Sequence, residues 1–389
     1  MGQFRFLTAG ESHGKGLVAI VEGMVADLPL EVAYINKQLE RRQHGYGRGP
    51  RMKIEEDEVE ILAGVRYGLT TGSPIAVFIT NRDWQNWQER LSVSPVEKQA
   101  EPVTCPRPGH ADLAGVTKYG LTDIRPIIER ASARETAARV AVGAIARRFL
   151  EQLGIDIYSH TLAIGRHRWE LGDASSIDWQ RVEASPVRCA NIRLEKAMMA
   201  SIDEAKANGD TLGGVFEVIA TGVPIGLGSH VTWDRRLDGR LAQAIMSINA
   251  VKGVEIGAGF ALAELKGSQA HDVIELRPRG KAKELPWRHV TNRAGGIEGG
   301  ITNGEDIVVR AAVKPIATLA KPLPSIDLRS GEAAKAHYER SDVCVVPAAG
   351  VIGEAMLAIV LADACLEKFG GDNLKEIQTN YRNYLRTIS

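Results

Sequence analysis

Two histidines stand in glycine-containing segments of the chain, where an imidazole could transfer a proton to a bound ligand. His13 lies in the string GESHG, directly after Ser12, and His110 lies in the string RPGHAD. An imidazole titrates near neutral pH and therefore suits general acid–base catalysis. Either ring could instead be a hydrogen-bonded loop histidine without a chemical role, so neither string defines a site by itself.

Arginines are concentrated around the same segments, and they would supply the positive charge that an anionic ligand requires. A glycine-rich loop, RRQHGYGRGPRMK, carries one group, and a second group surrounds His110. Guanidinium groups bind phosphate and carboxylate through paired hydrogen bonds. A solvated basic loop is the common alternative. The arginines of the two groups are Arg41, Arg42, Arg48, Arg51, Arg107, Arg125, Arg130 and Arg134.

A carboxylate completes the set of groups that could carry protons. Asp342 follows Arg340 in the string RSD, just before the most apolar segment of the chain. An aspartate beside an arginine is more often part of a salt bridge than a base. Taken together, these residues predict one anionic pocket that is lined by arginines and holds two imidazoles and one carboxylate.

Other classes of function fit the sequence less well. GESHG matches the serine hydrolase pattern GxSxG, but it follows a first short strand rather than a late central strand. The basic loop holds a single aromatic residue, Tyr46, whereas a surface that binds nucleic acid interleaves aromatic and basic residues. An ordinary flavin reductase is a third alternative, which NADPH oxidation without substrate would distinguish. No spacing of His, Cys, Asp and Glu indicates a metal site.

The composition is ordinary for a soluble globular protein and excludes several classes. Of 389 residues, 44% are hydrophobic and 25% are charged, which excludes a disordered chain, a collagen and a simple coiled coil. The 48 basic and 48 acidic residues cancel, so no global field would draw the protein onto nucleic acid or a membrane. Four scattered cysteines without a CxxC pair and the absence of a secretory signal pattern predict reduced thiols in a cytoplasmic protein.

Hydrophobic periodicity and glycine turns predict the elements that must position these residues. Apolar residues at a spacing of three and four are typical of helices, and β-branched runs bounded by glycine are typical of strands. Arg130 and Arg134 are four apart, which predicts that they share one helix face. Residues 81–104 are polar and predict an irregular excursion. The predicted strands are 4–9, 17–21 and 59–61, and the predicted helices are 30–42, 123–153 and 237–250.

The apolar segment 344–366 is long enough to span a membrane. Pro347, Glu354 and Asp363 interrupt it, however, and we expect a buried strand, turn and helix instead. The strings GVRYGLTTGSPIAVFIT and GDTLGGVFEVIATGVPIGLG both place a glycine-rich turn beside a β-branched run, which suggests two related halves. No linker divides the chain, so we expect one compact α+β unit.

Six strings of the sequence resemble the chorismate synthase family in order and spacing. They are GESHG, RRQHGYGRGPRMKIE, RPGHADLAGVTKYG, ERASARETAARVAVGAIA, INAVKGVE and RSDVCVVPAAGVIGEAM. Several strings exceed ten residues, and the resemblance runs nearly from end to end. It implies an α+β fold of the chorismate synthase type, a β-α-β sandwich, with residues 1–389 as a single catalytic domain.

The resemblance also implies a reaction and its requirements. Members of this family are lyases that convert 5-enolpyruvylshikimate 3-phosphate into chorismate and phosphate by an anti 1,4-elimination, the last common step of the shikimate pathway to aromatic amino acids. The reaction has no net redox change, yet it requires reduced FMN. NADPH would act only as an indirect reductant, through an external flavin reductase. A cytoplasmic homotetramer that binds neither nucleic acid nor a membrane is implied as well.

The family's functional residues carry over to the matching positions of this sequence. His13 resembles the acid that protonates the departing phosphate, and His110 resembles the residue at the pyrimidine edge of the flavin. Asp342 and Ser12 together resemble the relay that removes a proton. The residues that resemble the substrate clamp are Arg42, Arg48, Arg51, Arg107 and Arg134. The residues that resemble the flavin contacts are Arg130, Ala131, Ser132, Asn249, Ala250, Gly299, Lys314, Pro315, Ile316, Ala317, Thr318 and Arg340.

Overall fold

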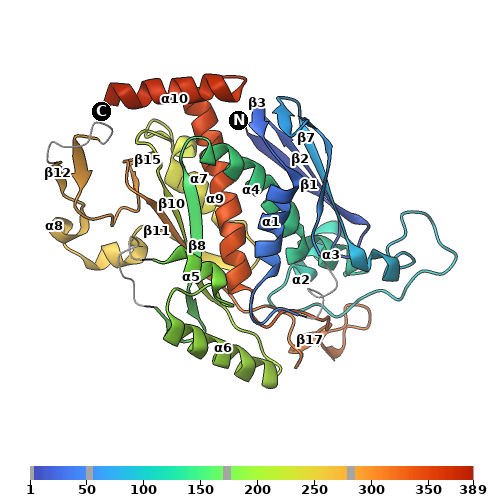
Figure 1. The fold of residues 1–389 in the computed structure, drawn as a ribbon. Coiled ribbons are helices and arrows are strands. Elements are labelled where there is room, and N and C mark those ends of the chain that lie inside the picture. Colours follow the sequence, from blue (N-terminus) through green and yellow to red (C-terminus); the bar gives the residue numbers. More distant parts are fainter. Residues whose placement is uncertain (1–3, 50–55, 170–176, 278–284, 389) are drawn as a thin grey trace.

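The fold has three layers, with helices packed between two β-sheets (Figure 1). Helices α4 (Thr136–Glu151) and α9 (Val346–Phe369) form the centre of the helical layer. This arrangement confirms the predicted α+β class and the β-α-β sandwich. The computed structural model describes residues 4–49, 56–169, 177–277 and 285–388.

The first sheet has four antiparallel strands, and one of its faces is covered by the helices. Side chains alternate across a strand, so Leu17, Ala19 and Val21 are buried against the helical layer. Leu7 and Ile20 pair across two strands on the opposite face and are exposed. In sheet order the strands are β1 (Arg5–Ala9), β2 (Gly16–Glu22), β7 (Ile75–Thr80) and β4 (Val59–Ala63).

The second sheet has five antiparallel strands and packs on the other side of α9. Phe216 and Val218 of its central strand are buried against the helix. A Cβ atom at Gly353 would lie 2.6 Å from the Phe216 ring, so the helix approaches the sheet closely because it carries glycine there. In sheet order the strands are β11 (Val251–Ile256), β16 (Ile307–Val313), β10 (Gly214–Thr221), β8 (Asp156–Ile164) and β9 (His167–Arg168).

The remaining elements lie around these layers, and α10 crosses one end of the molecule (Figure 1). The other helices are α1 (Val32–Gln43), α2 (Asp112–Tyr119), α3 (Arg125–Ala131), α5 (Trp179–Ala184), α6 (Ile192–Ala207), α7 (Leu237–Met246), α8 (Gly267–Ala270) and α10 (Leu374–Ile388). The other strands are β3 (Ala26–Pro29), β5 (Val65–Arg66), β6 (Leu69–Thr71), β12 (Ile274–Leu276), β13 (Trp287–His289), β14 (Ile297–Glu298), β15 (Ile301–Thr302), β17 (Pro324–Ile326) and β18 (Ala333–Lys335). The 3₁₀ turns are Arg82–Asn86, Ala133–Glu135, Trp233–Arg235 and Gly259–Glu264.

Most sequence-predicted elements are confirmed with shifts of a few residues at their ends. The strands expected over 4–9, 17–21 and 59–61 are β1, β2 and β4, and the first predicted helix is α1. The helix expected over 237–250 ends earlier, at Met246. Within 81–104 the chain forms a 3₁₀ turn and irregular structure, as predicted. The two sheets differ in strand number and order. They therefore give no support to the suggested relation between two halves of the chain, which stays a prediction.

The prediction for residues 344–366 is confirmed for the buried helix and wrong for the strand and the turn, because the 24-residue helix α9 already begins at Val346 and Cys344 forms an isolated β-bridge with Leu212. Pro347 occupies the first turn of α9, where the missing N–H costs nothing. Glu354 and Asp363 are accommodated by ion pairs instead of ending the helix. The helix is long and apolar enough to cross a membrane, but its most apolar 18-residue stretch is entirely buried inside the protein, as in a core helix.

The prediction of a single helix over 123–153 is also wrong, because the helix is interrupted at Ser132. This residue has an extended backbone, and its side chain accepts a hydrogen bond from the Arg134 N–H, so it caps the 3₁₀ turn that precedes α4. As a consequence, Arg130 and Arg134 do not share a helix face. Arg130 contacts the carbonyls of Thr8 and Gly10, whereas Arg134 is buried.

A buried network of charges joins α1, α4 and α9 to the loop between α5 and α6. Glu354 of α9 is 2% exposed and forms ion pairs with Arg41 at 2.7 Å, Arg147 at 2.6 Å and Arg188 at 3.2 Å. Burial alone would raise the pKa of Glu354, but the three guanidinium charges outweigh it and lower the pKa to about 2. The carboxylate is therefore ionised and holds four separate segments together.

Candidate active site

The GESHG turn connects β1 to β2 and contacts α3 through Arg130, which donates to the Gly10 carbonyl, and above all through Glu129. The backbone N–H of Ser12 donates to the Glu129 carbonyl at 3.1 Å, and the His13 N–H donates to Glu129 Oε2 at 2.7 Å. His13 Nδ1 lies 3.0 and 3.1 Å from the two carboxylate oxygens. The Ser12 hydroxyl pairs with that of Ser132 at 3.1 Å. The break at Ser132 thus brings the end of α3 against the turn.

A tryptophan from the irregular excursion covers the imidazole of His13. The Trp87 and His13 rings are stacked, with centroids 4.0 Å apart and planes inclined by 22°. The guanidinium of Arg125 also lies over Trp87, 5.3 Å from its ring centroid. Neither Trp87 nor Glu129 was predicted as a site residue; the only signal for Glu129 was its place in the string ERASARETAARVAVGAIA.

Arg42 and Arg134 converge on one buried carboxylate, Asp57, which sequence reasoning did not single out. Arg42 Nη2 lies 2.6 Å from Asp57 Oδ2, and Arg134 pairs with the other oxygen. Arg134 Nε also donates to Asn81 Oδ1 at 2.9 Å. Burial lowers the pKa of Arg42, with further contributions from the charges of Arg134 and Arg48. Cations in excess of the local carboxylate favour the binding of an anion here.

The basic loop folds onto the segment that precedes α9. A Cβ atom at Gly49 would lie 2.9 Å from the Ser341 carbonyl oxygen, so this close approach requires glycine. Gly49 N–H donates to Asp342 Oδ1 at 2.5 Å, and Arg48 Nη1 lies 3.2 Å from Asp342 Oδ2. Asp342 is therefore in an ion pair, as the cautious interpretation of the sequence expected, but its partner is Arg48.

His110 belongs to a cluster at the start of α2 that includes a further unpredicted carboxylate, Asp112. His110 Nδ1 lies 2.5 Å from Asp112 Oδ1, and Arg107 Nε lies 2.8 Å from Asp112 Oδ2. Burial alone would raise the pKa of Asp112, but hydrogen bonds from His110 and Arg107 lower it well below its usual range. Arg107 Nη1 also donates to Thr318 at 3.0 Å. Asp112 thus orients both predicted residues.

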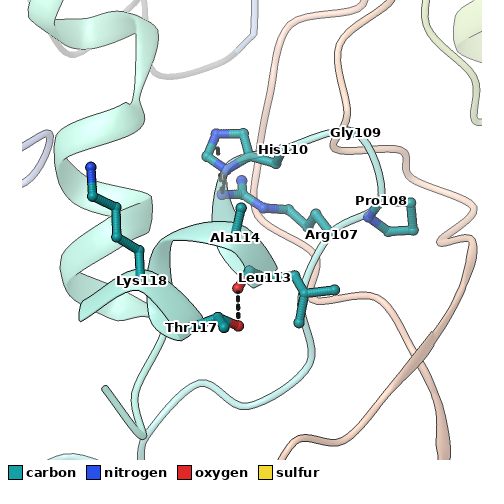
Figure 2. Close-up of a pocket in the computed structure, with 8 residues that line it drawn as sticks. All are labelled: Arg107, Pro108, Gly109, His110, Leu113, Ala114, Thr117 and Lys118. Carbon is teal, nitrogen blue, oxygen red and sulfur yellow. Dashed lines mark hydrogen bonds between the residues drawn. The ribbon is translucent and has the colours of Figure 1, made fainter. Parts of the chain in front are cut away.

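An open cavity of about 590 Å³ adjoins this cluster (Figure 2). Arg107 and His110 line it together with Leu113, Thr117 and Lys118 of α2. His13 is not among the residues that line this cavity. The structure therefore does not place the two imidazoles on the wall of one cavity, and the single anionic pocket expected from the sequence stays a prediction.

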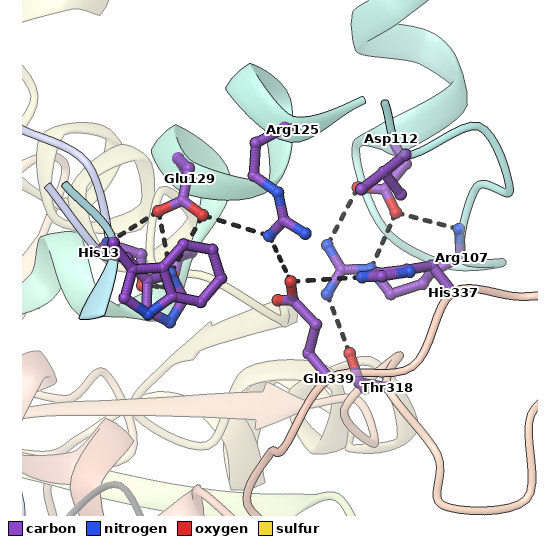
Figure 3. Close-up of polar contacts among 12 residues, drawn as sticks. His13, Arg107, Asp112, Arg125, Glu129, Thr318, His337 and Glu339 are labelled. Carbon is purple, nitrogen blue, oxygen red and sulfur yellow. Dashed lines mark hydrogen bonds and ion pairs between the residues drawn. The ribbon is translucent and has the colours of Figure 1, made fainter. Parts of the chain in front are cut away.

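A chain of polar contacts begins at His13 and leads toward the His110 cluster (Figure 3). Glu129 contacts Arg125 at 3.3 Å, and Arg125 also pairs with Glu339, whose carboxylate lies 3.3 Å from His337. The backbone N–H of His337 donates to the carbonyl of Cys105, which lies two residues before Arg107. Burial alone would raise the pKa of Glu339, but hydrogen bonds from His337 and Arg125 lower it to about 2.

Residues at the end of α3, between α7 and β11 and directly after β16 could hold an anionic aromatic cofactor. Asn249 Nδ2 donates to the Ala131 carbonyl at 3.0 Å, and among the described residues the buried Asn249 Oδ1 has no hydrogen-bond partner. Lys314 N–H donates to the Ala250 carbonyl at 2.9 Å, and its Nζ donates to the Gly109 carbonyl at 2.7 Å. An acceptor without a partner and a cationic side chain on two segments joined by a backbone hydrogen bond fit a flavin, which offers an imide N–H and a phosphate.

The other predicted flavin contacts are more widely placed. Pro315, Ile316 and Ala317 follow β16, and the Ile316 carbonyl accepts from the Thr211 hydroxyl at 2.8 Å. Gly299 lies in the β14–β15 hairpin and borders a different cavity of about 410 Å³. Arg340 is exposed next to Ser341. Arg51, a predicted clamp residue, lies outside the described residues.

The three-layer fold and the site together are those of an α+β protein whose arginines and histidines are suited to an anionic ligand. Comparison with known proteins agrees: the chorismate synthase family model matches residues 4–366. Chorismate synthase of Moorella thermoacetica is 59% identical over 99% of this chain and 100% of its own length. That of Streptomyces coelicolor is 54% identical over 100% and 99%. A crystal structure of chorismate synthase superposes with a TM-score of 0.79 at 46% identity, covering 99% and 98%. The chain belongs to the chorismate synthase family.

Proposed function

We propose that this enzyme converts 5-enolpyruvylshikimate 3-phosphate into chorismate and phosphate with the help of reduced FMN. Membership of the family supports the overall reaction. The observation that carries the proposal is the convergence of Arg42 and Arg134 on Asp57, close to Arg48. Asn81 links this cluster to the GESHG turn, because it accepts from Arg134 and donates to the carbonyls of Glu11 and Gly14. A cationic, largely buried cluster next to an oriented imidazole suits a substrate that loses phosphate.

The proposed elimination breaks one C–H and one C–O bond and forms a second ring double bond. The phosphate leaves with the electrons of its C–O bond, and a base takes the proton of the C–H bond. His13 donates a proton to the departing phosphate oxygen, and the nearby arginines stabilise the charge that develops there. Asp342 and Ser12 are the candidates for the relay that takes up the other proton.

Reduced flavin, when bound, supplies an electron-rich ring that can lend an electron to the substrate and recover it afterwards. Asn249, the backbone of Ala250 and Lys314 would hold it, with Arg130 as a further cation. His110, oriented by Asp112, would contribute a hydrogen bond at the edge of the ring. NADPH as an indirect reductant, an external flavin reductase and a cytoplasmic location belong to the same proposal.

Anaerobic turnover tests this function directly. The enzyme is mixed with photoreduced FMN and 5-enolpyruvylshikimate 3-phosphate, and phosphate release is followed together with the absorbance of the new diene. We expect both products in equal amounts and no turnover with oxidised FMN. Phosphate release without the diene, or equal rates with oxidised FMN, would contradict the proposal.

Arg48→Ala is expected to weaken substrate binding by about 10-fold to 100-fold, the scale of a lost charge-assisted hydrogen bond. The fold should persist, because Asp342 keeps the hydrogen bond from Gly49. Substrate affinity is measured by titration of the FMN-loaded enzyme, and FMN affinity serves as an internal control. Arg66→Ala in the exposed strand β5 is the matched variant, with no expected change. Unaltered substrate affinity in Arg48→Ala would contradict this role.

We also propose that copies of the chain associate through the outer face of the four-stranded sheet, as part of a homotetramer. Leu7 and Ile20 are 72% and 45% exposed and pair across β1 and β2. Association surfaces commonly contain contiguous exposed apolar side chains, which supports this face as the candidate. Sedimentation equilibrium should give a tetramer for the wild type and smaller species for Leu7→Lys combined with Ile20→Lys. A monomeric wild type would refute the proposal.

A further inference from the structure

Glu129 occupies an unusual position for a carboxylate, since its side chain is fully buried and shielded from solvent. It accepts the His13 backbone N–H and contacts His13 Nδ1 with both carboxylate oxygens. Its third contact is Arg125, at 3.3 Å. A buried carboxylate is costly unless such hydrogen bonds and charges satisfy it, so the geometry ties Glu129 specifically to the GESHG turn.

A carboxylate accepts hydrogen bonds and does not donate them, and this chemistry fixes the tautomer of His13. Nδ1 must carry its hydrogen toward Glu129, and proton exchange with a ligand must then occur at Nε2. An imidazolium that gives its Nε2 proton to a phosphate oxygen becomes the neutral Nδ1–H ring. Glu129 is therefore bonded to the form of His13 that remains after proton donation.

Trp87 restrains the same ring from a second direction. Its indole stacks on the imidazole with a centroid separation of 4.0 Å, which limits rotation of the ring out of the carboxylate plane. Arg125 contacts both restraints, because it lies over Trp87 and bonds to Glu129. Glu339 in turn holds Arg125 (Figure 3).

We propose that Glu129 is a positioning residue for the elimination: it fixes His13 in the Nδ1–H tautomer and aims Nε2 at the departing phosphate. The proposal rests on the proposed function only for the identity of the proton acceptor. The hydrogen on Nδ1 stays in place throughout, and the proton that moves is the one on Nε2. A carboxylate in this role contributes orientation rather than a bond to the substrate.

Glu129→Gln preserves the shape of the side chain but allows its amide to donate to Nδ1. We expect kcat to fall by about 10²-fold, the scale of lost acid–base assistance, with KM changed less than 3-fold. Glu151→Gln is the matched control: it removes another ion-paired carboxylate, at the distal end of α4, and should retain the wild-type kcat. Wild-type kcat in Glu129→Gln, or a loss that appears only in KM, would overturn the proposal.

A measurement on the unmutated enzyme keeps the test independent of folding and of activity. Ring ¹H–¹⁵N correlation spectra of ¹⁵N-histidine-labelled protein report which nitrogen of each neutral imidazole carries hydrogen, and His13→Ala assigns the His13 signal. We expect Nδ1–H for His13, and a shift toward Nε2–H in Glu129→Gln. An Nε2–H ring in the wild type would overturn the proposal. If the wild type makes no chorismate while His13 is Nδ1–H, the proposed function fails and the positioning does not.

Discussion

His13→Ala and His110→Ala should each reduce turnover of the reduced-FMN enzyme by about 10²-fold or more, the usual scale of general acid–base assistance. Neither change is expected to unfold the protein. Removing the His13 ring leaves Glu129 paired with Arg125, and removing the His110 ring leaves Asp112 paired with Arg107. Each buried carboxylate therefore keeps a cationic partner.

The two histidine variants should differ in whether they also lose affinity for reduced FMN. His13→Ala is expected to lower kcat with FMN affinity unchanged, because His13 would act on the departing phosphate. His110→Ala is expected to weaken the binding of reduced FMN as well, because the Asp112-oriented ring would contact the cofactor. His230→Ala, which removes an exposed imidazole, is the control. Wild-type turnover in either site variant under anaerobic conditions would remove that histidine from the mechanism.

Glu354→Gln should destabilise the protein by about 3–5 kcal/mol, the cost of leaving buried charges without their partner. Arg41, Arg147 and Arg188 all converge on this carboxylate, and each is largely buried. Urea unfolding, followed by circular dichroism, measures the loss. Glu22→Gln is the control, because its partner Arg5 lies in an exposed pair on the first sheet, and exposed pairs contribute little. An unchanged unfolding midpoint in Glu354→Gln would show that the network is not stabilising.

The pH dependence of the same variant provides a second test. The pKa of Glu354 is lowered from 4.5 to about 2, so its ionised form is stabilised by folding. The corresponding stability is fully present above about pH 4.5 and is lost as the pH falls toward 2. Glu183 and Glu339, with pKa values lowered to about 2, act in the same direction. The stability difference between wild type and Glu354→Gln should therefore shrink as the pH falls through this window.

Local spacing was sufficient to predict much of the secondary structure. The strands β1, β2 and β4 and the helix α1 follow from apolar periodicity, which depends only on neighbours in the sequence. The same reasoning failed at Ser132 and at α9. The hydroxyl of Ser132 caps a new turn and so interrupts the helix predicted over 123–153. Ion pairs with distant arginines allow α9 to continue through Glu354. Both outcomes depend on partners that periodicity does not register.

The candidate site, like the secondary structure, could be predicted only in part from the sequence. Residue types in short strings were enough to select His13, His110 and Asp342, because imidazoles, arginines and glycines in such strings are typical of anion chemistry. The carboxylates that orient the histidines, Glu129 and Asp112, were not selected, since an acidic residue in a helix ordinarily faces solvent.

Only the tertiary structure decided which carboxylate forms an ion pair with which cation. Asp57 and Asp342 lie far from each other in sequence, yet they hold neighbouring arginines of one cluster. The break at Ser132 carries Glu129 beneath the GESHG turn, 116 residues from His13 in the chain. Such pairings are set by how layers pack and by the cost of burying an unpaired charge, and that cost depends on distances through space rather than along the chain.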